Sequence, residues 1–149
     1  MILVDSNVFL IDRFFKRDAR FSDNKEFIER LGRIDAYVSV FTLLELCGLA
    51  SFNLSPDELR IWFFEFPTAY DVKILEPSFN RSISGGELFD AFLLHLFGEI
   101  EKKATLGDAL ILKEIKAHDI IKILVTWNKK HFEYRTDIEV LTPAEFNTK

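Results

Sequence analysis

Short apolar runs recur along the chain with longer amphipathic stretches between them, and this alternation constrains the fold more than any other feature. The five runs are rich in aliphatic and β-branched residues, as buried strands are, and cover residues 2–4, 36–40, 70–75, 120–126 and 138–141. Strands that alternate with helices usually pair in parallel, with the crossover helices covering the sheet. We therefore predict an α/β protein with helices on both faces of a mostly parallel sheet.

The length and charge of the chain bound its organisation. The 149 residues match one ordinary domain, so we expect residues 1–149 to form a single domain. A net charge of −5 argues against a protein that coats nucleic acid through a global positive field. The acidic excess is confined to residues 34–100, with three bases and ten acids, while residues 1–33 and 101–149 each carry one more base than acids. The net charge therefore does not exclude a local basic surface that binds nucleic acid.

The sequence gives no sign of a membrane segment or of cysteine chemistry. No run approaches the ~18 uninterrupted apolar residues of a membrane helix, and the apolar start meets Asp5 without a basic leader region. The single cysteine, Cys47, cannot form an internal disulfide. We expect a cytoplasmic protein with no membrane partner.

Capping residues and prolines predict the helix boundaries. Asp23 is expected to cap a helix over about 24–33, and Thr42 to open a largely apolar helix. Ser55, followed by proline and then glutamate at the third helical position, is a strong helix start, and this helix is expected to end before Pro67. Further helices are expected over 87–103, 108–118 and 143–146.

Two phenylalanine-rich stretches, 62–66 and 89–97, lie within the expected helices. We interpret them mainly as core, since aromatic side chains dominate core energetics. The alternative is a groove for a partner helix or a dimer interface.

Three acids stand where a ligand site of an open parallel sheet would form, beyond the carboxyl ends of its strands. Asp5 directly follows the first strand, Glu45 is the only charged residue between Ala36 and Pro56, and Asp108 opens a late helix. Each has a structural alternative: Asp5 as a helix cap, Glu45 as the capping-box partner of Thr42, and Asp108 as a capping residue. Converging carboxylates repel one another and favour a hard cation, so we expect Mg²⁺ or Mn²⁺ if they meet.

Other chemistries fit the sequence less well. The three histidines and Cys47 lack the spacing of zinc motifs. There is no phosphate-binding GxxxxGK[ST] loop, no dinucleotide GxGxxG motif and no GxSxG nucleophile elbow. A receiver-like phosphoacceptor is disfavoured, because no paired acids precede Asp5.

Five short motifs, taken in order, resemble those of a PIN domain of the VapC toxin type, and the resemblance covers essentially the whole chain. They are ILVDSNVF from Ile2, TLLEL from Thr42, GDALI from Gly107, VTWNKKHF from Val125 and LTPAEF from Leu141. The resemblance implies a three-layer α/β/α fold and a ribonuclease that depends on Mg²⁺ or Mn²⁺. It also implies a homodimer and a cognate VapB-type antitoxin that blocks the site.

The resemblance assigns roles residue by residue. Asp5, Glu45 and Asp108 match the first three metal-binding acids, and the fourth acidic position is occupied by Asn128, which supplies no charge and puts a second metal in doubt. The polar positions expected to line the pocket and orient the acids are Ser6, Asn7 and Thr126.

RNA would be held by basic residues near the pocket, with single-stranded loops as the expected target. The first candidates are Lys129 and Lys130, and the second are Arg13, Lys16 and Arg17. Two alternatives stay open: a PIN-fold RNA-processing nuclease outside a toxin pair, and a catalytically weak binding or regulatory module, which Asn128 favours.

Overall fold

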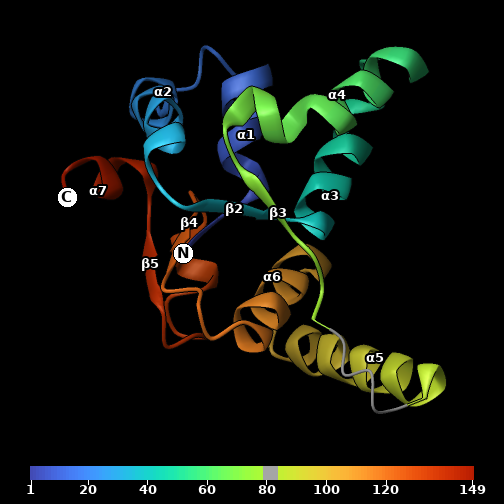
Figure 1. The fold of residues 1–149 in the computed structure, drawn as a ribbon. Helices are drawn as coiled ribbons and strands as arrows, with labels where there is room; N and C mark the ends of the chain where they lie inside the picture. The colour runs from blue at the N-terminus through green and yellow to red at the C-terminus, as the bar shows by residue number, and fades with distance from the viewer. Residues whose placement is uncertain (79–83) are drawn as a thin grey trace.

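The computed structural model describes residues 1–78 and 84–149 and has a five-stranded sheet at its centre (Figure 1). The strands are β1 (Ile2–Val4), β2 (Ala36–Ser39), β3 (Lys73–Leu75), β4 (Ile123–Val125) and β5 (Glu139–Leu141). Their order is β3-β2-β1-β4-β5, and every neighbouring pair is parallel. The predicted parallel α/β architecture is confirmed, and β1 coincides with its apolar run, while the other four strands are shorter than theirs.

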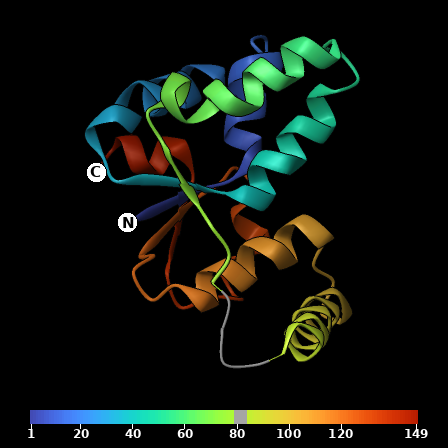
Figure 2. The same ribbon diagram turned by 45° about the vertical axis from the view of Figure 1, so that its right-hand side comes forward.

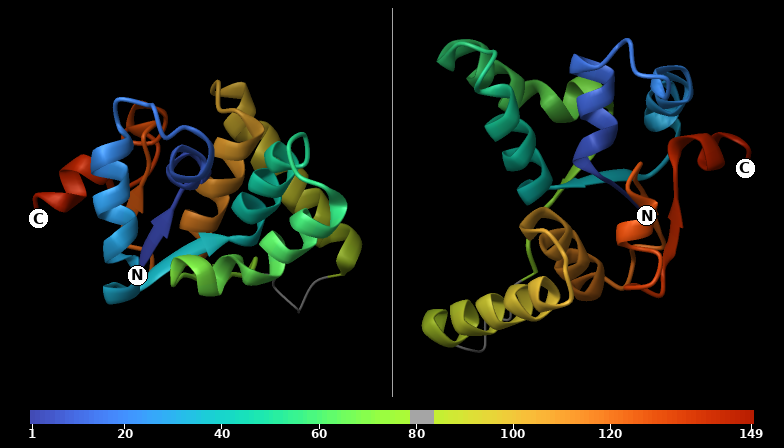
Figure 3. Two further views of the ribbon diagram at one scale, coloured as in Figure 1. Left: turned by 90° about the horizontal axis from the view of Figure 1, so that it is seen from above. Right: turned by 180° about the vertical axis from the view of Figure 1, so that it is seen from behind.

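Helices cover both faces of the sheet (Figure 2). They are α1 (Ser6–Phe14), α2 (Phe21–Arg30), α3 (Val40–Ala50), α4 (Pro56–Tyr70), α5 (Gly85–Glu101), α6 (Leu106–Ala117) and α7 (Pro143–Asn147), with short 3-10 turns η1 (Leu31–Arg33) and η2 (Lys129–His131). The first four helices lie on one face, and α6 lies on the other with α5 along its outer side (Figures 2 and 3). These are the three layers of an α/β/α sandwich.

The strands divide the core in two because neighbouring side chains point to opposite faces of the sheet. Val4 and Val125 pack toward α1, α2 and α3, in a cluster with Phe9, Phe27 and Leu46. Their strand neighbours pack on the other face with α6, in a cluster that contains Leu3, Leu124, Ile111, Leu112 and Phe132. Both faces of the central strands β1 and β4 are therefore buried, which explains why every residue of these two strands is apolar.

Helices α5 and α6 each begin two residues earlier than predicted, and the starts of α2 and α3 also differ from the prediction. Helix α2 begins at Phe21 without a side-chain cap and not after Asp23, because Asp18 organises the preceding turn by accepting hydrogen bonds from the backbone and guanidinium of Arg20. Helix α3 begins at Val40 and not at Thr42. Its cap is Ser39, whose hydroxyl accepts a hydrogen bond from the backbone N–H of Phe41.

The expected end of α4 before Pro67 is wrong, since the helix continues to Tyr70. The rings of Phe66 and Tyr70 both pack on Phe9 at centroid distances of 4.9 Å, and the Tyr70 hydroxyl donates to Asp12. These contacts stabilise the last turn of α4 and offset the loss of the backbone hydrogen bond that Pro67 cannot donate.

The core interpretation holds for much of the first phenylalanine-rich stretch but fails for the second. Phe66 is fully buried and Trp62 and Phe63 pack against the core, whereas Phe64 is exposed. In α5 the apolar side chains that face away from α6 are exposed: Phe89, Leu93, Leu94, Phe97 and Ile100. We name these five residues the α5 apolar face.

Candidate active site at the carboxyl ends of the strands

The order of the strands creates a switch point between β1 and β4. From β1 the chain builds β2 and β3 on one side of the sheet, and then crosses over to build β4 and β5 on the other. Crossovers that diverge in this way leave a crevice at the carboxyl ends of the two strands, which is where open α/β sheets bind ligands. Asp5 follows β1 and Thr126 follows β4, so both residues stand at this point.

Asp5 is a buried carboxylate held by neutral donors. Only 4% of the residue is exposed to solvent. One carboxylate oxygen accepts from the backbone N–H of Ser6 at 2.6 Å, and the other accepts from the Asn7 amide and the Thr126 hydroxyl, each at 2.6 Å. Asp5 is therefore the cap of α1 and a buried acid at once, so the two interpretations of this residue do not exclude each other.

The surroundings of Asp5 make its charge costly. Burial is the main cause that raises the pKa of this carboxyl to about 6, from an ordinary 3.8. The hydrogen bonds from Thr126 and Ser6 oppose the rise, while repulsion from Glu45 and Asp108 adds to it. The electrostatics thus connect the three acids that the sequence singled out.

Asn7 and Thr126 fix the segment that follows β4. The Asn7 amide also donates to the Thr126 hydroxyl at 3.0 Å, and its oxygen accepts from the backbone N–H of Trp127 at 3.0 Å. The same hydroxyl accepts from the backbone N–H of Asn128 at 2.9 Å. Both residues therefore orient Asp5 and the loop together.

Glu45 lies in the second turn of α3, beyond reach of a capping role, because the helix begins at Val40 and Ser39 is its cap. Its side chain is exposed and approaches the start of α6 at Gly107, where a Cβ atom would lie only 3.0 Å from Glu45 Oε1. Glu45 also lines a mainly apolar groove of about 410 Å³ between α3 and α6, with Phe41, Leu106 and Leu110 among its walls. The capping-box alternative for Glu45 is therefore wrong.

Asp108 is the third residue of α6 and forms a capping box with Thr105. Its backbone N–H donates to the Thr105 hydroxyl at 3.2 Å, and Asp108 Oδ2 accepts from the Thr105 backbone N–H at 3.4 Å. The same oxygen lies 3.1 Å from Nδ1 of His131. This contact was not predicted, because nothing in the spacing of residues 108 and 131 indicates it.

The three acids are of the chemical type that binds a hard divalent cation. In this structure, however, their side chains do not lie close enough together to form a complete metal site. All three supply carboxylate oxygens, and the buried Asp5 has only neutral hydrogen-bond donors around a charge that a cation would stabilise. Over residues 1–78 and 84–149, no three acidic, histidine or cysteine side chains already lie close enough to hold a metal ion. Rotation of side chains such as the exposed Glu45 would be needed to complete a site.

Comparison with known proteins rests on structure, because no family model and no curated protein matches the chain. A solved structure of FitAB bound to an IR36 DNA fragment is similar over 97% of this chain and 96% of that chain, with 18% identity and a TM-score of 0.61. FitAcB from Neisseria gonorrhoeae is similar over 96% and 98%, with 18% identity and a TM-score of 0.57.

The chain has a PIN-like fold. The three-layer α/β/α architecture implied by the resemblance is thereby confirmed across nearly the full length of the chain. In this PIN-like fold the candidate acids come from three elements, the end of β1, the second turn of α3 and the first turn of α6.

The basic candidates differ in how free their side chains are. Lys130, Arg13, Lys16 and Arg17 are exposed, whereas Lys129 forms an ion pair with Glu145 at 2.7 Å. The guanidinium of Arg20 lies 5.6 Å from the ring centroid of Trp127, which brings the basic connection between α1 and α2 up to the loop after β4. The two residues are more than 100 positions apart in the chain, so no local pattern in the sequence indicates this contact.

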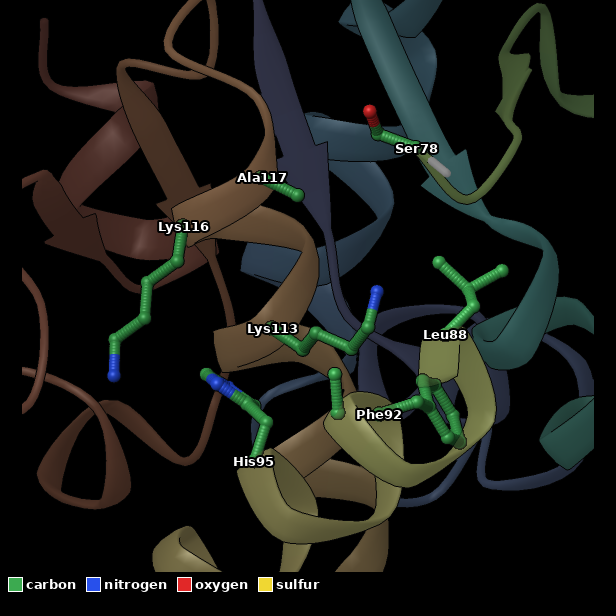
Figure 4. A pocket seen from close by; sticks show the side chains of 8 residues that line it. Ser78, Leu88, Phe92, His95, Lys113, Lys116 and Ala117 are labelled. Carbon is green, nitrogen blue, oxygen red and sulfur yellow. The ribbon is translucent and has the colours of Figure 1, made fainter. Parts of the chain in front are cut away.

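A separate cavity of about 270 Å³ lies between α5 and α6 (Figure 4). Its walls include Phe92, His95, Lys113 and Lys116, and none of the candidate acids lines it.

Within the described part of the chain, no helix is long and apolar enough to span a membrane.

Proposed function

We propose that the chain is an endoribonuclease dependent on Mg²⁺ or Mn²⁺, with Asp5, Glu45 and Asp108 as its metal-binding acids. The observation that carries the proposal is the buried Asp5 carboxylate at the switch point, whose pKa is raised in part by the two other acids. A buried acid without a cationic partner is unusual unless a ligand offsets its desolvation.

The residues of the site would divide the work between them. A bound Mg²⁺ or Mn²⁺ would lower the pKa of a coordinated water and stabilise charge on the phosphodiester. Asn7 and Thr126 hold the Asp5 carboxylate in one orientation, and Gly107 leaves room for Glu45 beside α6. Asn128, exposed after β4, adds no negative charge, so the proposal requires one metal ion and not two.

RNA would approach along the basic residues beside the site. Lys130, Arg13, Lys16 and Arg17 are exposed and able to contact phosphates, and they remain candidates. Lys129 is a weaker one than the sequence suggested, since it would have to leave Glu145. Single-stranded segments suit the site, because unstacked nucleotides can enter a narrow crevice.

We propose that the nuclease belongs to a toxin–antitoxin pair, and the likeness in fold to FitAB and FitAcB supports this assignment. We further propose that the antitoxin is of the VapB type. The proposed homodimer has a physical basis in the α5 apolar face, where Leu94 is 72% and Phe97 59% exposed. Exposed apolar residues gathered on one helix mark interaction surfaces. A second copy of the chain would cover this face.

The test of the nuclease assignment is a pair of isosteric variants, Asp5→Asn and Glu45→Gln. Each is expected to abolish Mn²⁺-stimulated cleavage of single-stranded RNA while the protein stays folded by circular dichroism. Asp90→Asn in α5, distant from the site, is the matched carboxylate control and should cleave like the wild type. Full cleavage by both site variants would show that the assigned acids are wrong.

A binding or regulatory module is the second candidate, favoured by Asn128 and by acids that do not yet gather as a metal cluster in the described residues. Calorimetric titration with Mn²⁺ separates the two, because a module without a metal site gives no heat of binding and no cleavage under any condition. An upstream reading frame for a small protein with a DNA-binding N-terminus would distinguish a toxin from an RNA-processing nuclease.

A further inference from the structure

We infer that His131 is a positioning residue, which orients the Asp108 carboxylate for metal binding through a hydrogen bond from its Nδ1–H. This inference rests on the proposed function, because it concerns a ligand of the proposed metal site. Its central observation is the 3.1 Å separation between His131 Nδ1 and Asp108 Oδ2, which joins η2 to the first turn of α6.

The backbone around His131 is fixed well enough to hold a side chain in place. The N–H of His131 donates to the carbonyl of Asn128 at 2.8 Å, and the N–H of Phe132 donates to that of Lys129 at 3.0 Å. Phe132 is fully buried in the α6 side of the core. The imidazole is thus attached to an anchored turn, although about half of the side chain itself is exposed.

Asp108 needs such a partner because its other hydrogen bond through Oδ2 is weak. The backbone N–H of Thr105 reaches that oxygen only at 3.4 Å, near the limit of a hydrogen bond. Of the two contacts, that to His131 is the shorter. Removing His131 would therefore leave the carboxylate freer to rotate at the edge of the site.

The geometry also specifies which nitrogen carries the proton. A carboxylate only accepts hydrogen bonds, so Nδ1 must be the donor, and in the neutral imidazole Nε2 is then the unprotonated nitrogen. Partners of this kind around metal ligands restrict the orientation of the ligand, and their loss typically lowers metal affinity about 10–100-fold.

The experiment compares substitutions that differ in where they offer an N–H. His131→Ala removes the donor, His131→Asn offers an amide near the position of Nδ1, and His131→Gln offers one near the position of Nε2. Calorimetric Mn²⁺ affinity is measured for each, with Tyr134→Ala as control, since Tyr134 lies in the same segment and is 90% exposed. Metal-free ¹H–¹⁵N spectra of the imidazole report the tautomer.

The expected result is about a 10–100-fold loss of Mn²⁺ affinity in His131→Ala, recovery in His131→Asn but not in His131→Gln, and no change in Tyr134→Ala. The spectra should show an Nδ1-protonated ring in the wild type, and Asp108→Asn should change them. Unchanged affinity in His131→Ala, or recovery only in His131→Gln, would overturn the positioning role and leave the nuclease proposal standing. Failure of the wild type to bind Mn²⁺ would instead overturn the proposed function, and the inference with it.

Discussion

The hydroxyl of Thr126 donates a 2.6 Å hydrogen bond to the carboxylate of Asp5, joining residues 121 positions apart in the chain. Both residues are buried, and each directly follows one of the two strands at the switch point. The same hydroxyl accepts hydrogen bonds from Asn7 and from the backbone of Asn128. One side chain thus connects the first acid of the site to the loop that completes it.

Replacing Thr126 by valine should reveal how much this connection stabilises the protein. The variant keeps the shape of the side chain but removes one of the hydrogen bonds to the buried Asp5 carboxylate and leaves the backbone N–H of Asn128 without its acceptor. The expected cost is about 1–3 kcal/mol in the free energy of unfolding. Urea denaturation measures the loss. Thr148→Val, near the exposed C-terminal end of α7, is the control, and equal stabilities of the two variants would contradict the prediction.

The pKa of Asp5 predicts a pH dependence of stability in the metal-free protein. Its folded value of about 6 lies above the ordinary 3.8, so the folded state binds this proton more tightly than the unfolded state. The resulting stabilisation is complete below about pH 4 and is lost as the pH rises through about 6, amounting to about 3 kcal/mol. Added Mn²⁺ should counteract the loss, because a cation favours the ionised carboxylate.

Urea unfolding between pH 4 and 7 in the presence of a chelator tests this dependence. Asp5→Asn lacks the titrating group, so the wild type should lose stability relative to the variant as the pH rises. Subtraction removes the contributions of the other carboxyls. Parallel curves for the two proteins would mean that Asp5 titrates normally.

Gly107→Ala should separate stability from function. Alanine favours a helix over glycine by up to about 1 kcal/mol, so the variant should be at least as stable as the wild type. The new Cβ would lie 3.0 Å from Glu45 Oε1 and push that carboxylate aside, which should weaken Mn²⁺ binding and RNA cleavage. Calorimetry and a cleavage assay measure the two effects.

The chain contains a position-matched control for this substitution. Gly86 is the second residue of α5, as Gly107 is of α6, and a Cβ at Gly86 would meet nothing within 4 Å. Gly86→Ala should leave metal binding unchanged. In a Glu45→Ala background, Gly107→Ala should also have no further effect, and a persisting effect would point to a cause other than the contact with Glu45.

Much of this architecture follows from local patterns in the sequence, and the exceptions have identifiable causes. The buried strands and the helix start at Ser55 depend only on neighbouring residues, and both predictions are confirmed. Pro67 stays inside α4 because Phe9, distant in sequence, packs on the turn around it. Tertiary contacts of this kind override local rules and leave no local trace.

The candidate site was predictable in its acids but not in its supporting contacts. Asp5, Glu45 and Asp108 stand out by position and isolation, and the structure relates them electrostatically. The contact of His131 with Asp108 depends instead on the path of the chain after β4, which only the folded structure defines. The prediction that residues 89–97 are mainly core failed for another reason. A helix that covers a core and a helix with an exposed apolar surface have the same hydrophobic periodicity, so the sequence does not distinguish them.

The α5 apolar face gives a direct test of the proposed homodimer. Phe97→Glu places a charge in the middle of the face and should convert a dimer to a monomer, because an unpaired charge in an apolar interface is strongly unfavourable. Light scattering coupled to size-exclusion chromatography measures the mass. Phe52→Glu, at an 87% exposed residue after α3, is the control. A wild type that is monomeric would contradict the proposed homodimer. A Phe97→Glu variant that is still dimeric would show that the α5 apolar face is not the dimer interface.

The pairing of β1 with β4 has a consequence for the order in which the site can form during synthesis. A nascent chain that has grown only as far as α6 already contains all three acids, yet the strand that borders Asp5 and the hydroxyl that holds it have not been made. On the proposed function, a polypeptide emerging from a ribosome, and so surrounded by RNA, would acquire its cleavage activity only after its last strands are translated.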